Sequence, residues 1–242
     1  MDSPSWPDLA NRLTVSLGLN TPPIAITFAA DVPDGVDAYA GPKPTPASDG
    51  RTGPVPAGCV FWTKAIERTF STVASDHANC SVGTLVHGFA GLDEVAGNSD
   101  VAAILDSGWV TMEQIPAIPT VQERPGSVTY GPLDQASATP DVVLIRISAA
   151  QLMVMAEAVP ELKIGGKPQC HVVAAAKQNG EVAASLGCTL SRSRTGQADH
   201  EMTCAIPGVR LPEVIAGVEE KARVDAVAES YAAADLQRFV EF

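Results

Sequence analysis

The stretch Val142-Val-Leu-Ile-Arg-Ile147 is the clearest β-strand in the chain. Its apolar character is continuous rather than alternating, which is typical of a strand buried on both faces of a sheet. Thr139-Pro140-Asp141 marks its start, and Ser148 is placed to cap a helix predicted over 149–158. A buried strand followed at once by a helix indicates a fold of the α/β or α+β class.

The flanking sequence extends this mixed pattern in both directions. Apolar spacing predicts helices over 7–17, 59–71, 99–105, 211–218 and 222–240. Short strands are predicted over 24–28 and 202–206, a short strand or a turn over 128–133, and 172–176 begins either a helix or a strand. The segment 31–56 is rich in Pro, Gly, Asp and Ser, so it is predicted to be a long irregular connection that either covers a site or is mobile.

Four of the five cysteines fall into two similar segments. In the first, Cys59 opens an apolar run, and Cys80 follows in the loop His77-Ala-Asn79-Cys80-Ser-Val-Gly83. In the second, Cys170 opens an apolar run, and Cys188 follows in Leu186-Gly187-Cys188-Thr-Leu-Ser191. A predicted strand precedes each segment. The sequence therefore predicts an internal duplication inside a single domain of 1–242, with half-repeats over 20–90 and 139–192 and pseudo-twofold symmetry; the alternative is a chance similarity between the two segments.

Composition excludes several classes of protein. The net charge is −12 and the 16 basic residues form no patch, so we expect no nucleic-acid partner. No stretch approaches 18 apolar residues, and the N-terminus lacks a signal peptide, so we expect a cytoplasmic protein without a membrane partner. The expected partner is a small-molecule ligand, with a homo-oligomer as an open alternative.

The cysteines are the candidate metal ligands. A reducing cytosol keeps thiols free, and an odd number of cysteines cannot pair completely within one chain. Thiolates are soft, charged ligands that suit zinc, Cu(I) or an iron–sulfur cluster. The spacing is neither that of a zinc finger nor that of a ferredoxin, so a shared site requires the two segments to meet in space. The predicted ligands are Cys59, Cys80, Cys170 and Cys188; the alternative is that each packs as a small apolar side chain, as predicted for Cys204.

Polar residues around the first cysteine loop complete the candidate site. His77 and His87 flank Cys80 and are predicted to move protons in catalysis, although a histidine also serves as an ordinary polar contact. Asn79, Ser81 and Gly83 are predicted to bind a cofactor or anion through a loop of backbone N–H groups, the alternative being an ordinary turn. Arg192 joins them as a cofactor-binding residue, because local arginines such as Arg192 and Arg194 can hold a small anion.

At these residues the chain resembles the family called domain of unknown function number 169, a group of uncharacterised bacterial and archaeal proteins. The matching features, in order, are Pro23-Ile-Ala-Ile-Thr-Phe28, Cys59, Asn79-Cys80-Ser-Val-Gly83, Gly131-Pro-Leu133 with Pro140-Asp-Val-Val-Leu144, Cys170 and Gly187-Cys188. The family typically has a glycine and then an arginine after the last cysteine. Here Thr189-Leu190-Ser191 replaces the glycine, and Arg192 is present. The resemblance supports the choice of cysteines and implies no reaction.

Three hypotheses about function follow. The first is a cysteine-ligated metal or iron–sulfur centre, with redox or lyase chemistry on a small molecule. The second is a metal-free thiol enzyme in which Cys80 is the nucleophile and His77 or His87 is its base. The third is a small-ligand binding module with structural cysteines.

Overall fold

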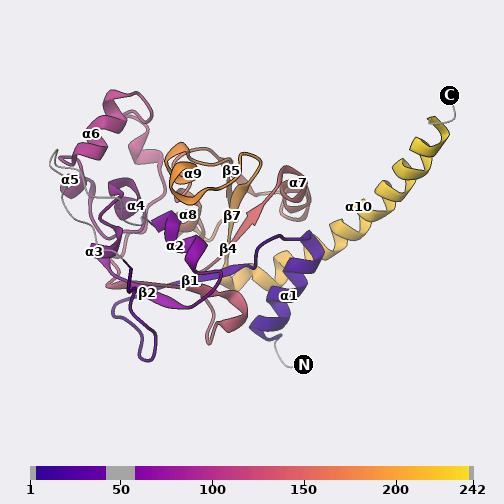
Figure 1. Ribbon diagram of the computed structural model, residues 1–242, viewed down its shortest axis with the longest axis horizontal. Helices are drawn as coiled ribbons and strands as arrows, with labels where there is room; N and C mark the ends of the chain where they lie inside the picture. The colour runs from indigo at the N-terminus through magenta and orange to yellow at the C-terminus, as the bar shows by residue number, and fades with distance from the viewer. Residues whose placement is uncertain (1–3, 42–57, 240–242) are drawn as a thin grey trace.

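The fold is built on one mixed seven-stranded sheet. It is seen in a computed structural model that describes residues 4–41 and 58–239 (Figure 1). The strand order is β2-β3-β1-β4-β7-β6-β5, and all neighbours are antiparallel except β5 and β6. The strands are β1 (Ile24–Ala29), β2 (Phe70–Thr72), β3 (Ser127–Pro132), β4 (Val142–Ile147), β5 (Lys163–Gly165), β6 (Ala183–Ser185) and β7 (Met202–Pro207).

Helices cover both faces of this sheet. The α-helices are α1 (Trp6–Leu17), α2 (Gly58–Lys64), α3 (Ala74–His77), α4 (Ser81–Val86), α5 (Leu92–Val95), α6 (Ser99–Asp106), α7 (Ala149–Ala158), α8 (His171–Asn179), α9 (Thr189–Thr195) and α10 (Leu211–Phe239). Three 3-10 turns join them, η1 (Ile115–Ala117), η2 (Leu133–Gln135) and η3 (Gly208–Arg210). The mixed α/β class predicted from the sequence is confirmed.

Strand β4 separates two apolar cores, as its continuous apolar sequence predicts. Val143, Ile145 and Ile147 belong to the core that contains residues of α1, α7 and α10. Val142 and Leu144 belong to the core on the opposite face, which contains residues of α2 and α8 and a group of aromatic side chains. Because successive side chains of a strand point to opposite faces, the unbroken apolar run serves both cores.

The strands on the two sides of the β1–β4 contact pair in corresponding registers. Strand β1 pairs with β3 so that Ile24 lies opposite Pro132, and β4 pairs with β7 so that Val142 lies opposite Pro207. A 3-10 turn follows each proline, and the first N–H of each turn donates to the residue before the partner strand, at 2.9 Å for Leu133 and 3.0 Å for Gly208. The six strands other than β5 therefore follow the same order and antiparallel pairing outward from the β1–β4 contact on either side.

Three predicted elements differ in the structure. The helix predicted over 59–71 ends at Lys64, and β2 occupies its last residues because Phe70 pairs with Tyr130. The helices predicted over 211–218 and 222–240 form the single helix α10, which projects from the body of the molecule (Figure 1). Most of the predicted connection 31–56 lies outside the described residues.

The long helix α10 carries many charged residues along its length. In the part of the chain that the structure describes, no helix is both long enough and apolar enough to cross a membrane.

Candidate functional site

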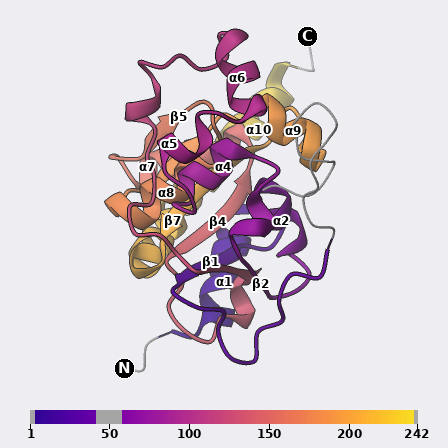
Figure 2. The same cartoon turned by 90° about the vertical axis from the view of Figure 1, so that its left-hand side faces the viewer.

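Four cysteines lie at the N-terminal ends of four different helices. Cys59 is the second residue of α2, while Cys80, Cys170 and Cys188 directly precede α4, α8 and α9 as their N-caps. Figures 1 and 2 both show these four helices gathered on one side of the sheet, and α2 packs against both α4 and α9. The fold thus brings together segments that lie far apart in the sequence.

The four thiols line one small cavity. Its volume is about 30 Å³, which is room for about two water molecules. Its wall also includes Gly58, Gly83, Trp109, Pro168, Gln169, Ser191 and Arg194, with Val82 and Leu190 as apolar neighbours. The cysteines of both sequence segments therefore line the same cavity.

Burial keeps two of these thiols protonated at neutral pH. The pKa of Cys59 is raised to about 11, mainly by burial; the Ser191 hydrogen bond and Arg194 oppose this rise, and Cys80 and Cys188 add to it. Burial likewise holds the pKa of Cys170 well above its ordinary value, with additional contributions from Cys80, Cys59 and Cys188. Because a charge on one thiolate raises the pKa of its neighbours, negative charge cannot accumulate here unless a cation compensates it.

Several groups around the cavity are placed to compensate such charge. Arg194 donates a side-chain hydrogen bond to Cys80 and also lies close enough to Cys59 and Cys188 to interact with them electrostatically. The N–H of Gly83 donates to Sγ of Cys80 at 3.4 Å, and Ser191 forms a side-chain hydrogen bond with Cys59. Both kinds of contact favour a thiolate over a thiol.

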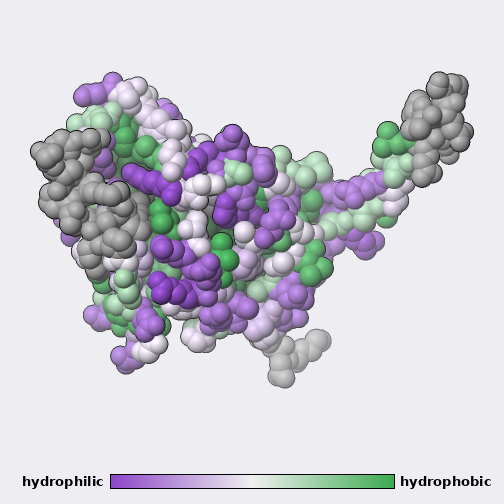
Figure 3. Space-filling model, in the orientation of Figure 1, coloured by the Kyte–Doolittle hydropathy of each residue, from purple (hydrophilic) through white to green (hydrophobic). Residues whose placement is uncertain are grey.

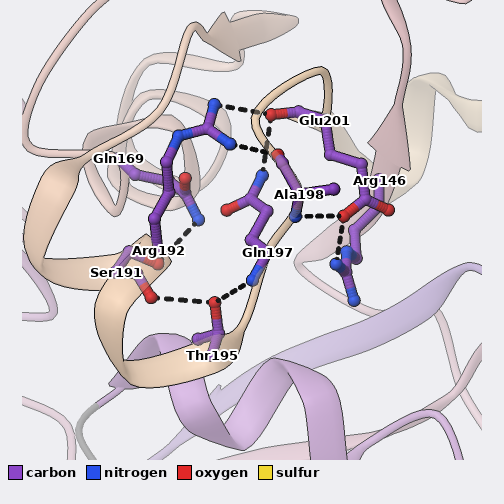
Figure 4. A network of polar contacts seen from close by, with 8 residues as sticks. All are labelled: Arg146, Gln169, Ser191, Arg192, Thr195, Gln197, Ala198 and Glu201. Atoms are coloured by element: carbon purple, nitrogen blue, oxygen red, sulfur yellow. Dashed lines mark hydrogen bonds and ion pairs between the residues drawn. The ribbon is translucent and has the colours of Figure 1, made fainter.

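A polar network fixes helix α9, which carries Ser191 and Arg194 into the cavity wall. Figure 4 shows its core, in which the Arg192 guanidinium donates to the carbonyl oxygens of Ala198 and Glu201, the latter at 2.8 Å. The Glu201 carboxylate accepts the N–H of Ala198 and pairs with Arg146 on strand β4. Gln169 on the other wall donates to Ser191 Oγ at 3.1 Å, so the network joins the two sides of the second cysteine segment.

The cavity is not a preformed single-ion site. Among residues 4–41 and 58–239, no group of three or more His, Cys, Asp or Glu side chains is already placed to hold one metal ion. The four sulfurs therefore share a cavity without converging on one point. A rotation about χ1 moves a cysteine sulfur by about 3 Å, so small rearrangements change this geometry substantially.

The two histidines predicted to be catalytic lie behind α2 rather than in the cavity wall. His77 and His87 are 1% and 0% exposed, and their ring centroids are 5.5 Å apart. Burial lowers the pKa of His87 to about 4 and holds the pKa of His77 well below its ordinary value, so both rings are neutral. A Cβ atom added to Gly58 would lie 3.3 Å from Cε1 of His87 and 3.5 Å from Nδ1 of His77, which places both rings directly beneath the start of α2.

The residues predicted to bind a cofactor have different surroundings from one another. Gly83 lines the cavity, whereas Ser81 is held by the Asp100 carboxylate through its N–H at 3.0 Å and its hydroxyl at 2.7 Å. The backbone oxygen of Asn79 lies 3.5 Å from Nη2 of Arg194. The donors of Arg192 face backbone carbonyls, and Arg194 is the arginine that reaches the thiols.

The fifth cysteine is separate from this site. Cys204 is fully buried in the core that faces α1 and α10, and burial raises its pKa to about 12. The prediction that it packs as an apolar residue is confirmed.

A comparison with protein families identifies one match, which covers residues 12–217. The matching family is DUF169, described as "Uncharacterised ArCR, COG2043". Neither the curated proteins nor the solved structures contain a significant match to the chain. Because the match spans the sheet, the four cysteines and the polar network around α9, the chain belongs to the DUF169 family.

Proposed function

We propose that Cys59, Cys80, Cys170 and Cys188 bind a soft metal centre, either zinc or an iron–sulfur cluster. The observation that carries the proposal is the convergence of four helix N-termini, each with a cysteine, on one cavity. Four thiols from distant segments in one cavity form a ligand set that single buried cysteines would not produce. Thiolates at these positions would suit soft metals, which displace the thiol protons on binding.

The surroundings of the cavity support a negatively charged metal–thiolate centre. Four thiolates around zinc, or around a cluster, leave a net negative charge that Arg194 would partly neutralise. The hydrogen bonds from Gly83 to Cys80 and from Ser191 to Cys59 would raise the reduction potential of a cluster, because donors to sulfur stabilise the reduced, more negative state.

Geometry separates the two kinds of centre. Zinc requires sulfurs within about 4 Å of one another, which the small cavity could provide after side-chain rotations. A cubane cluster spreads its sulfurs to roughly 6–7 Å and requires the short helices α2, α4 and α9 to move apart. A cluster would support redox or lyase chemistry on a small molecule beside Trp109 and Gln169, whereas zinc with four cysteine ligands would be a closed, redox-inactive structural site.

We also propose that the site is built by two equivalent halves related by a pseudo-twofold axis at the Ala25–Val143 pair. The corresponding registers of β1–β3 and β4–β7 support this proposal, as does the equal pairing of Phe70 with Tyr130 and of Ala183 with Ala205. In each half one cysteine lies at the start of a helix, α2 or α8, and a second cysteine caps a later helix, α4 or α9. An experimental structure in which the two halves failed to superpose would contradict this proposal.

Metal analysis after anaerobic purification tests the centre. Stoichiometric iron and sulfide with visible absorption would establish a cluster, and one colourless zinc per chain would establish a zinc site. Serine at any of the four positions should lose the metal and lower the stability, because binding energy contributes to folding energy. Cys204→Ser is the matched control and should retain the metal. Well-folded protein that neither retains nor takes up zinc, iron or a cluster would overturn the proposal.

One observation favours a second candidate, a thiol enzyme with Cys80 as its nucleophile. Cys80 is the cavity thiol that receives both the Arg194 hydrogen bond and a backbone N–H. If this candidate holds, metal-free protein should be alkylated at Cys80 much faster than at Cys59 and Cys170, whose raised pKa values keep them protonated, and substrate or inhibitor should protect Cys80.

A further inference from the structure

The two buried histidines carry one unpartnered nitrogen each. Nδ1 of His77 and Nε2 of His87 are buried and have no hydrogen-bond partner among the described residues. Buried polar atoms are nearly always paired, so two such atoms on neighbouring rings require an explanation. The rings lie outside the four-cysteine cavity, so the explanation is independent of the metal centre proposed above.

The hydrogen bonds of the other two nitrogens fix the tautomer of each ring. Nδ1 of His87 lies 2.8 Å from the carbonyl oxygen of Gly83, which only accepts, so this nitrogen carries the proton. Nε2 of His77 lies 2.9 Å from Oγ1 of Thr72, whose own proton is donated to the carbonyl of Val128 at 3.0 Å. Thr72 therefore accepts, and Nε2 of His77 carries the proton.

Each unpartnered nitrogen is therefore unprotonated and carries a free lone pair. Two lone pairs cannot bond to each other, so an occupant that satisfies both must be an electron-pair acceptor or a proton donor. Metal-binding histidines typically donate their second N–H to a carbonyl or to another oxygen, which fixes the ring and raises its basicity. Gly83 and Thr72 supply this support to His87 and His77.

The side chains around His77 and His87 indicate which charge and coordination number an ion bound between them would have. The centroids of the Phe61 and Phe89 rings lie 4.9 and 4.7 Å from that of His77, and the Phe28 ring stacks 6.0 Å from that of His87. Such rings favour a cation of low charge. In the described part of the chain no carboxylate or thiol completes a group of three ligands with these imidazoles. A dication, which needs anionic ligands in an apolar setting, does not fit.

We propose that His77 and His87 form a second site, in which Nδ1 of His77 and Nε2 of His87 bind a monovalent closed-shell metal ion of the Cu(I) type in two-coordinate geometry. Gly58 closes the site from above, and its lack of a side chain leaves the two rings uncrowded.

The first test is imidazole nitrogen NMR on the full ¹⁵N-labelled chain, with Ag(I) as an air-stable substitute for Cu(I). Before Ag(I) is added, we expect a protonated Nε2 on His77 and a protonated Nδ1 on His87. Once the thiols are saturated, Ag(I) should shift Nδ1 of His77 and Nε2 of His87 and leave the two protonated nitrogens in place. Unchanged resonances, as a bridging water would give, would overturn the proposal.

The second test counts bound Ag(I) in variants that keep all five cysteines. His77→Gln and His87→Gln should each bind one ion fewer than the natural chain, whereas the controls His171→Gln and His200→Gln should bind the same number. Thr72→Val removes the hydroxyl that orients His77, so the affinity for this one ion should fall about 10- to 100-fold. Equal stoichiometry in all four histidine variants would contradict the site. If a variant does not fold, the NMR titration of the natural chain decides.

Discussion

Arg192 and Arg194 lie on the same short helix, but their guanidinium groups have different surroundings. Arg192 donates to the backbone oxygens of Leu186, Ala198 and Glu201, whereas Arg194 faces the thiols. We expect Arg192→Ala to lower the free energy of unfolding by about 1.5–3 kcal/mol, because three backbone carbonyls, two of them partly buried, lose a charged donor. Chemical denaturation measures this change.

Arg194→Ala is the matched variant, and we expect it to affect thiol reactivity rather than stability. It should change the free energy of unfolding by less than about 1 kcal/mol and slow the alkylation of Cys80 in metal-free protein, since a cation beside a thiol favours the reactive thiolate. If Arg194→Ala is the more destabilising of the two, the assignment of Arg192 to the fold and of Arg194 to the site is wrong.

The buried histidines predict how stability depends on pH. Their folded-state pKa values lie below the unfolded value of about 6.5, so below that pH the unfolded chain binds protons that the native state excludes. The free energy of unfolding should therefore be unaffected by them above pH 6.5. It should fall by about 1.4 kcal/mol per pH unit for each histidine as the pH drops toward 4.

Urea titrations between pH 7.5 and 5 measure this slope before most carboxylates titrate. His87→Gln should flatten it, and the exposed His200→Gln should leave it unchanged. A slope that is identical in all three proteins would show that the buried rings are not responsible.

At the scale of one element, the loop before α9 depends on a single glycine. Gly187 has φ of +120°, and a Cβ atom there would lie 2.6 Å from Nη2 of Arg192. Gly187→Ala should therefore cost about 1–3 kcal/mol of stability and displace Cys188 from the cavity. Gly166→Ala is the control, because its Cβ would meet nothing within 4 Å. Thermal unfolding and metal content together check this prediction.

The sequence predicted the elements whose local signals agree with their packing. Strand β4 and helix α7 follow their apolar pattern and the Ser148 capping box, and α1 begins at the Ser5 cap and ends at Gly18 in the left-handed conformation. Strand β2 was not predicted, because three residues carry little periodicity and only pairing with β3 makes them a strand.

Only part of the arrangement of the candidate site could be predicted from the sequence, because the rest depends on contacts between distant segments. Residue type and local loop composition pointed to the four cysteines, and their meeting depends on the pairing of distant strands. Arg192 and Arg194 have different contacts because of the position of α9 against Glu201. No local sequence pattern encodes that position. The positions of His77 and His87 beneath Gly58 depend likewise on how α2 packs.

At the scale of the whole molecule, the family match ends at residue 217, whereas α10 continues to Phe239. Its first turns bury Val214, Ile215 and Val218, and Arg12 pairs with Glu219 at 2.8 Å. Beyond these residues, Val227, Tyr231 and Leu236 are 69%, 73% and 65% exposed, and Figure 3 shows apolar and polar residues side by side on the projecting arm.

We therefore expect a chain shortened after Lys221 to keep its thermal stability and the metal centre proposed above. The removed turns contribute little to either core, since exposed helix turns add little to folding energy. Calorimetry of the shortened and full chains checks this prediction, with a chain shortened after Arg210 as the destabilised control. A loss of more than a few degrees on removal of the projecting part would show that it packs against the body or against a second copy.

The placement of the cysteines at four helix ends also has a consequence for biosynthesis. A ribosome exposes Cys59 and Cys80 long before Cys170 and Cys188 have been made, and strands β4, β6 and β7 must pair before all four thiols meet. The early cysteines thus spend the whole elongation period as an incomplete, exchangeable pair. If the proposed metal centre forms, cells would have to deliver the metal after translation, and a shortage of metal would leave complete chains with unligated thiols.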